Sequence, residues 1–238
     1  MLNKEPSRWW RYGVVFVALT GLGVLVWIAA NTYTGDVGTP IPTRVVDVNG
    51  QTVFTGADII AGQQVFQKHG LMENGTIWGH GAYLGPDFSA AYLHQLALDT
   101  KDPASLSENR YDGKTGTLRF TASEAASYRH QIDQWKTYFA GSIASRGLSD
   151  KTITDPEELR ELVAFFAWTA WGAAALMPGK SYSYTQNFPY EPLLHNGPSG
   201  GAVLWSALSL ITLLAGTGVV LLAFGRFDFL GWKSRDSH

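Results

Sequence analysis

Two uncharged segments stand near the ends of the chain, and each is long enough to cross a lipid bilayer as a helix. Tyr12–Ala30 has 19 residues and Ala202–Phe224 has 23. A hydrocarbon core about 30 Å thick needs roughly 20 apolar residues in helical conformation. Aromatic residues of the kind that gather at membrane interfaces lie near their ends: Trp9, Trp10, Trp27, Tyr33 and Trp205. The pattern predicts two transmembrane helices, 12–30 and 202–224.

A cleaved signal peptide is the competing interpretation of the first segment. The apolar region of a signal peptide usually has only about 7–15 residues, and a small-residue cleavage site follows it. Tyr12–Ala30 is longer, and no Ala-x-Ala pattern follows Ala30. We therefore expect an uncleaved anchor.

The charges beside the two segments predict their orientation. Residues 1–11 and 225–238 together carry six Lys or Arg against three acids, whereas residues 31–201 carry twelve against seventeen. Positively charged flanks remain in the cytoplasm. We expect both termini to be cytoplasmic and residues 31–201 to be external, in the periplasm of a Gram-negative cell. A cytoplasmic enzyme and a nucleic-acid-binding protein are both disfavoured, and the net charge of -2 also gives no reason to expect nucleic acid.

Alternating and helical patterns divide residues 31–201 into short elements. The sequence RVVDVNGQTVF places Asn49-Gly50 between two β-branched arms, which predicts a hairpin with a two-residue type I′ turn. Ser89–Asp99 has the period of an amphipathic helix whose inward face carries Tyr92, Leu93, Leu96 and Ala97. Residues 100–116 are polar and loop-like, and 117–120 has the character of a short strand.

Two further helices are predicted from their capping residues. Thr121 and Glu124 have the spacing of a capping box, which opens a helix running to about Ala140. Asp155-Pro156 opens another with an N-cap and a proline at the first helical position, and that helix runs to about Ala175. The fold class expected is a mainly α membrane protein, with two transmembrane helices flanking an external domain that has minor β-hairpins.

A glycine-dense loop follows an amphipathic run at Gly62–His69. Its glycines are Gly70, Gly75, Gly79, Gly81 and Gly85, which fit neither a helical nor a strand period. Such spacing indicates backbone folded tightly around something. In a cytochrome c, a helix and loop of this kind carry a Cys-x-x-Cys-His attachment for haem. This chain has no cysteine, so thioether-linked haem is excluded.

Residues 62–87 resemble the haem-binding stretch of the cytochrome c subunit of nitric oxide reductases, down to the Gly-x-Gly-Ala-Tyr-x-x-Pro pattern that ends at Pro86. The chain is more similar still to the N-terminal, haem-less part of quinol-dependent nitric oxide reductase. The runs FFAWTAW (165–171) and SYTQNFPYEPL (183–193) carry that similarity. In this alignment Leu71 and Asn74 stand at the cysteine positions and Gly75 at the histidine. The resemblance implies a cytochrome-c-like fold for residues 31–201.

The resemblance also implies a function, a partner and an interface. The chain would be a non-catalytic part of a complex that reduces two NO to N₂O, capping the external face of the catalytic subunit and shaping the region where quinol delivers electrons. Haem b, haem b3 and non-haem iron would belong to that partner. The interface residues implied are Gly79, His80, Gly81, Ala82, Tyr83 and Pro86, and the backbone oxygens of Gly81 and Tyr83 would bind Ca²⁺ there. A loop that serves packing alone is the other interpretation.

The residues themselves support a vacated haem position. The chain's methionines are Met1, Met72 and Met177, so none lies in the segment leading into the Asp155 helix, where an axial ligand would be expected. We expect the space to be filled by Leu71, Ile77, Trp78 and Phe139, since a large cavity would be costly. The six histidines show no metal-binding spacing, and His80 is more readily explained as bonded to loop backbone than as a proton or quinol ligand.

No catalytic residues are expected in this chain, because its sequence contains no nucleophile elbow or phosphate loop. Two alternative functions remain open: a membrane-anchored binding or assembly protein without a reductase partner, and a subunit of another gas reductase of the haem-copper superfamily. Gly81→Val is expected to weaken assembly with the partner while the external domain stays folded.

Overall fold

The computed structural model describes residues 8–34, 38–141, 148 and 152–227, and it divides into two compact units, 1–40 and 41–238. The first unit contains helix α1 (Arg8–Thr34), within which Tyr12–Ala30 is long and apolar enough to cross a membrane. The last described element of the second unit is helix α6 (Gly200–Phe227), in which Gly200–Arg226 meets the same criterion. Both predicted membrane segments are therefore helical, and most of the apolar side chains described in them are exposed.

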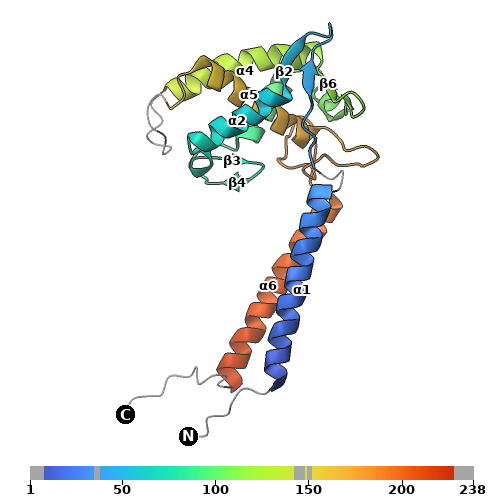
Figure 1. The fold of residues 1–238 in the computed structure, drawn as a ribbon, viewed down its shortest axis with the longest axis vertical. Helices are drawn as coiled ribbons and strands as arrows, with labels where there is room; N and C mark the ends of the chain where they lie inside the picture. The colour runs from blue at the N-terminus through green and yellow to red at the C-terminus, as the bar shows by residue number, and fades with distance from the viewer. Residues whose placement is uncertain (1–7, 35–37, 142–147, 149–151, 228–238) are drawn as a thin grey trace. The chain divides into compact units, whose positions relative to one another are not determined.

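Between these two helices in the chain comes a mainly helical domain with two small sheets, as the sequence predicts (Figure 1). Its elements in chain order are β1 (Arg44–Val46), β2 (Thr52–Thr55), α2 (Gly56–Lys68), the 3₁₀ helix η1 (Leu71–Glu73), β3 (Thr76–Ile77), β4 (His80–Gly81), α3 (Phe88–Asp99), the 3₁₀ helix η2 (Pro103–Ser107), β5 (Tyr111–Asp112), β6 (Thr117–Arg119), α4 (Ala122–Ala140) and α5 (Pro156–Ala174). Four strands form one sheet in the order β2-β1-β6-β5, in which only β1 and β6 are parallel, and β3 pairs with β4.

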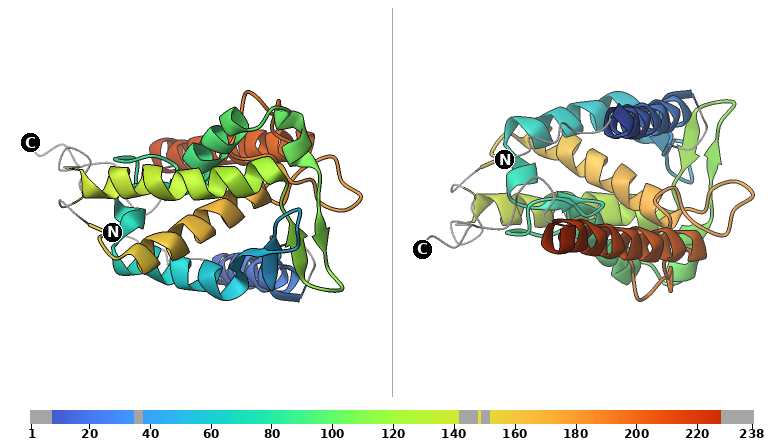
Figure 2. Two further views of the ribbon diagram at one scale, coloured as in Figure 1. Left: turned by 90° about the horizontal axis from the view of Figure 1, so that it is seen from above. Right: turned by 90° about the horizontal axis from the view of Figure 1, so that it is seen from below.

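Helix α5 is the centre of this unit. It packs against α2, α3 and α4, and Figure 2 shows it running between α2 and α4 with the four-stranded sheet at one end. A Cβ on Gly62 of α2 would meet the backbone of Glu161 and the side chain of Phe165, so glycine allows α2 and α5 to approach closely. Thirteen of the nineteen residues of α5 are buried, which explains why the FFAWTAW run is apolar on most of its faces.

The helix ends follow the predicted caps. Thr121 Oγ1 accepts a hydrogen bond from the Glu124 amide, and the Glu124 carboxylate accepts one from the Thr121 amide at 2.7 Å, which is the predicted capping box. Asp155 caps α5 by accepting from the Glu157 amide at 2.9 Å. Tyr92, Leu93, Leu96 and Ala97 are buried on α3, as their spacing predicts.

The first hairpin forms where it was expected, but its predicted type I′ turn is wrong. The Gly50 amide donates to the Asp47 carbonyl, and Gly50 has a φ of +78° while Asn49 does not have a positive φ. A type I′ turn needs positive φ at both central residues. The Asp47 carboxylate explains the difference, since it accepts from the amides of Asn49 and Gln51, both at 2.9 Å, and closes a three-residue loop.

Candidate functional site

The glycine-dense loop is organised by one carboxylate, Asp87. Its two oxygens accept from the Thr76 hydroxyl (2.8 Å), the Gly79 amide (2.6 Å), the Ser89 hydroxyl (2.6 Å) and the Ala90 amide (2.8 Å). Asp87 therefore caps α3 and holds the β3–β4 hairpin through the same side chain. Asp87 was not among the predicted site residues, although its position directly before α3 is typical of an N-cap.

Trp78 connects this loop to the FFAWTAW helix. Its indole Nε1 donates to the Thr169 carbonyl at 2.9 Å, and its ring lies 5.5 Å from that of Trp168. The Trp78 backbone has a φ of +51°, which is uncommon for a large side chain, and its amide donates to the Ser89 hydroxyl at 2.8 Å. Trp78 therefore lies half-buried against the core at the place where the loop meets α5, whereas Leu71, Ile77 and Phe139 are buried as predicted.

The SYTQNFPYEPL segment lies against the same loop. A Cβ on Gly79 would lie 2.8 Å from the Phe188 ring, so that ring sits directly over the glycine. Glu191 is buried, and its carboxylate lies 3.1 Å from Nδ1 of the exposed His94 on α3. The structure thus brings together three motifs that are distant in the sequence: the loop, the α5 run and residues 183–193.

Backbone strain is concentrated in these segments. Among the residues that the structure describes, the non-glycine residues with positive φ are Trp78, Gln186, Asn187 and His195. All four lie in the loop or in residues 183–198. Conformations of this kind persist only where the surroundings impose them, and they cluster at functional sites.

The face that these segments form is exposed and partly apolar. Tyr83 is 87% exposed and Leu84 63%, while Phe188 and Tyr190 are about half exposed. Of the other residues implied as interface, His80 and Gly81 are exposed in β4, and Gly79, Ala82 and Pro86 are partly buried. We call this face, made by residues 79–86 and 188–190, the loop face.

Gly81 has a structural role within the domain, contrary to the expectation that Gly81→Val would leave the domain folded. Its φ is +140°, and a Cβ there would overlap the Gly75 carbonyl oxygen and lie 3.0 Å from that of Met72. The Ala82 amide donates to the same Met72 carbonyl at 2.8 Å. Only glycine fits here, because a side chain would separate β4 from η1.

The residues present supply few ligands for Ca²⁺. Within the described chain, no three His, Asp or Glu side chains lie close enough to hold a metal ion. Asp87, the acid closest in sequence to Tyr83, is occupied by its four hydrogen bonds. Ca²⁺ takes six to eight oxygen ligands. The two carbonyl oxygens of Gly81 and Tyr83 are fewer than this number.

The positions aligned with a haem attachment are occupied by core packing. Leu71 and Asn74 are buried, and a Cβ on Gly75 would overlap the Pro86 carbonyl oxygen and meet the Phe88 ring. Phe88 stacks on Phe166 at 5.0 Å in a cluster that continues through Phe66, Trp135 and Phe139. Without cysteine the chain has no Cys-x-x-Cys-His site, and a histidine at position 75 would collide with this cluster.

The acidic residues at the start of α5 make ion pairs rather than a reactive cluster. Glu158 contacts Lys68 and His69, and Arg160 bridges Asp58 (3.1 Å) and Glu157 (2.6 Å). Hydrogen bonds from Lys68 and His69 lower the pKa of Glu158. These groups fasten α2 to α5, and none of them belongs to the loop face.

Comparison with known proteins identifies the domain. The family profile of the NorB cytochrome c-like domain of nitric oxide reductase matches residues 42–105 and 95–190, which together span more than half of the chain. No curated protein matches the chain. The cytochrome-c-like fold expected from the sequence is thereby confirmed over residues 42–190.

Proposed function

The chain belongs to the NorB cytochrome c-like family of nitric oxide reductases, and from this premise we propose that it is a non-catalytic part of such a reductase. In this proposal the domain caps the catalytic subunit on its external face and helps to shape the region where quinol delivers electrons. The partner holds haem b, haem b3 and non-haem iron, and it reduces two NO to N₂O. This chain contributes shape and contact surface.

The observation that carries the proposal is the convergence of the three family motifs at the glycine-dense loop, two of which form the loop face. Exposed apolar side chains such as Tyr83 and Leu84 project from a backbone that Asp87 and Trp78 hold rigidly. A preorganised apolar surface loses little conformational entropy on association. Aromatic anchors of this kind are also the residues that dominate protein interfaces. Gly79, His80, Gly81, Ala82, Tyr83 and Pro86 belong to this proposed interface.

The location of the complex is part of the proposal. Both α1 and α6 would span the cytoplasmic membrane, with the termini in the cytoplasm and the cytochrome-c-like domain in the periplasm. The excess of Lys and Arg at both ends supports this orientation. Ca²⁺ at Gly81 and Tyr83 would be shared with the catalytic subunit, and metal analysis of the purified complex with and without a chelator tests it.

A charged substitution on the loop face tests the docking role. Leu84 is 63% exposed, so Leu84→Glu should leave the domain folded but place a carboxylate in the desolvated interface. We expect at least a tenfold loss of co-purifying haem protein after mild detergent extraction, together with a loss of NO consumption by membranes. Val48→Glu is the matched control, because Val48 is 67% exposed at the tip of the first hairpin.

The result separates the proposal from its alternatives. Unchanged assembly and activity in Leu84→Glu would mean that the loop face is not the contact surface. A membrane-anchored binding or assembly protein would purify without a many-helix haem protein. Another gas reductase of the same superfamily would co-purify with haem but would not consume NO.

A further inference from the structure

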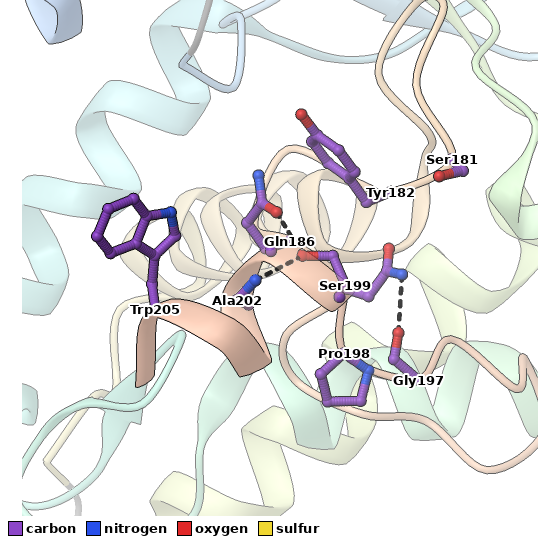
Figure 3. Close-up of a pocket in the computed structure, with 11 residues that line it drawn as sticks. Ser181, Tyr182, Gln186, Gly197, Pro198, Ser199, Ala202 and Trp205 are labelled. Carbon is purple, nitrogen blue, oxygen red and sulfur yellow. Dashed lines mark hydrogen bonds between the residues drawn. The ribbon is translucent and has the colours of Figure 1, made fainter. Parts of the chain in front are cut away.

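A cavity of about 730 Å³ lies where residues 181–187 meet the first turn of α6. Figure 3 shows Gln186, Ser199 and Trp205 on its walls, with Tyr182 above them. None of its lining residues belongs to the loop face or to the haem-aligned positions, and none of the roles assigned to the family motifs accounts for it. Its volume is in the range of pockets that take small ligands.

The wall of the cavity is held rigid by side-chain hydrogen bonds. Asn187 accepts from the Ser183 amide (2.7 Å) and donates to the Gly197 carbonyl (2.9 Å). The Ser199 hydroxyl donates to the Gln186 side-chain oxygen at 2.6 Å and accepts from the Ala202 amide (Figure 3). Gln186 and Asn187 have φ values of 60° and 65°. These bonds hold two adjacent residues in a strained conformation, so the cavity is preformed.

The chemistry of the lining favours a ligand rich in hydrogen-bond acceptors. Among the cavity residues described, none carries a charge. The side-chain nitrogen of Gln186, the Tyr182 hydroxyl and the Trp205 indole N–H are donors that have no acceptor in the described protein. No carboxylate lies among the lining residues, so none would repel the negative charge of a phosphodiester. Oxygen atoms of a phosphodiester or an ester are therefore suitable acceptors for these donors.

A second concavity lies beside the first, along the apolar helix α6. It has a volume of about 420 Å³ and is lined by Trp205, Leu208, Ser209, Thr212 and Leu213. Trp205 belongs to both hollows. A polar hollow at the end of a membrane-length helix, beside a mainly apolar hollow on that helix, is complementary to an amphiphile with a polar head and an aliphatic chain.

We propose that this cavity is a phospholipid site. The phosphodiester and ester oxygens of the headgroup accept hydrogen bonds from Gln186, Tyr182 and Trp205, and one acyl chain lies in the groove along α6. The lipid comes from the leaflet at the Gly200 end of the helix. The groove distinguishes a lipid from a free phosphate, because a soluble phosphate has no chain to fill it.

Native mass spectrometry of the full chain in detergent tests the site, with palmitoyl-oleoyl-phosphatidylglycerol and glycerol 3-phosphate as separate probes. The blocking variant is Gly201→Phe: Gly201 lines the cavity, and the nearest atom to an added Cβ is Ser199 Oγ at 4.0 Å. Gly218→Phe is its control, since that glycine is also in α6 with nothing within 4 Å. Tyr182→Phe removes one hydroxyl and leaves the ring.

We expect one lipid to be retained per wild-type chain and per Gly218→Phe chain. Occupancy should fall at least tenfold in Gly201→Phe, and affinity by about fivefold in Tyr182→Phe for the loss of one hydrogen bond. Glycerol 3-phosphate should not be retained. Equal retention by wild type and Gly201→Phe would overturn the proposal, as would an equal loss in Gly218→Phe or retention of glycerol 3-phosphate comparable with the lipid.

Discussion

Among single residues, Gly81 shows how an exposed glycine can be required by the backbone beneath it. A valine there would need a φ of +140° and would collide with the Gly75 carbonyl. We expect Gly81→Val to destabilise the domain by about 3 kcal/mol or more, which lowers the Tm of the full chain in detergent by roughly 6–12 °C. Near-ultraviolet circular dichroism during heating measures this.

Gly70→Ala is the matched control for this prediction. Gly70 also has a positive φ, of +60°, but nothing lies within 4 Å of an added Cβ. Gly70→Ala should lower the free energy of unfolding by only about 1–2 kcal/mol, which is the cost of the left-handed conformation for a residue with a side chain. If Gly81→Val destabilised the domain no more than Gly70→Ala does, the overlap with the Gly75 carbonyl would not contribute to the loss of stability.

A second residue, Glu158, makes the domain sensitive to acid. Its folded-state pKa is lowered from 4.5 by hydrogen bonds from Lys68 and His69, so the ionised form stabilises the fold. This contribution is complete above the unfolded pKa and is lost as the pH falls through the folded value. We expect the urea concentration at the unfolding midpoint to decrease once the pH is below about 4.5. Glu158→Gln should weaken that dependence without removing it, because the pKa values of Asp58 and Asp99 are lowered as well. Glu73→Gln, on η1, is the control for removing a carboxylate while keeping the hydrogen bonds from Lys68 and His69.

Among the helices and strands, the aromatic cluster between them fills the core beside Gly75, the position that the sequence resemblance aligns with a haem-attachment histidine. Phe88 at the start of α3 is fully buried and contacts Phe66, Trp135, Phe139 and Phe166. Phe88→Ala should cost about 3–5 kcal/mol of unfolding free energy, because the cluster cannot collapse around the void. Urea unfolding monitored by tryptophan fluorescence checks the value.

Phe188→Ala is the control for ring removal, since Phe188 is 48% exposed and lies outside the core. It should cost much less stability than Phe88→Ala. Comparable losses from the two variants would mean that residues 188–190 belong to the domain's folding unit and are not a surface for docking.

The same elements show how far the sequence can predict this fold. Helices α4 and α5 were predicted nearly to the residue because their caps are local: Thr121 with Glu124, and Asp155 with Pro156. Strands β3, β4 and β5 have two residues each, too short for any period to reveal them. The turn of the first hairpin was missed because the Asp47 carboxylate, and not the Asn49-Gly50 pair, decides its geometry.

The candidate site was predictable only in part. Its glycines and family motifs are visible in the sequence, but the contact of Phe188 with Gly79 joins residues more than a hundred positions apart. The role of Asp87 depends on hydrogen bonds from Thr76 and Gly79, which the β3–β4 hairpin brings close to it. No local sequence pattern predicts that hairpin. The cavity beside α6 depends in the same way on residues 181–187 meeting the helix start.

For the chain as a whole, two apolar helices flank the family domain in sequence. We expect the charged residues next to these helices to determine their orientation across the membrane. The flanks carry six Lys or Arg against three acids. We expect reporter fusions after Asn31 and Trp232 to lie on opposite sides, external and cytoplasmic respectively, because each position follows one further crossing. A fluorescent protein active only in the cytoplasm and a phosphatase active only outside it measure this. Two fusions reporting the same side would contradict the two-span topology.

The orientation can also be tested by removing the flanking charges. Arg8, Arg11, Lys233 and Arg235 supply most of the positive flank, and changing all four to glutamine leaves one basic residue at each end. Inversion would require the basic flanking residues to cross the membrane, and this requirement is what opposes it. The variant should therefore show a mixed orientation, in which a fraction of the molecules reports an external C-terminus. Lys180→Gln and Lys101→Gln, which lie between the spans, should leave the orientation unchanged. If the four-site variant kept the wild-type orientation completely, the flanking charge would not determine the topology, and folding of the domain between the spans would be the stronger determinant.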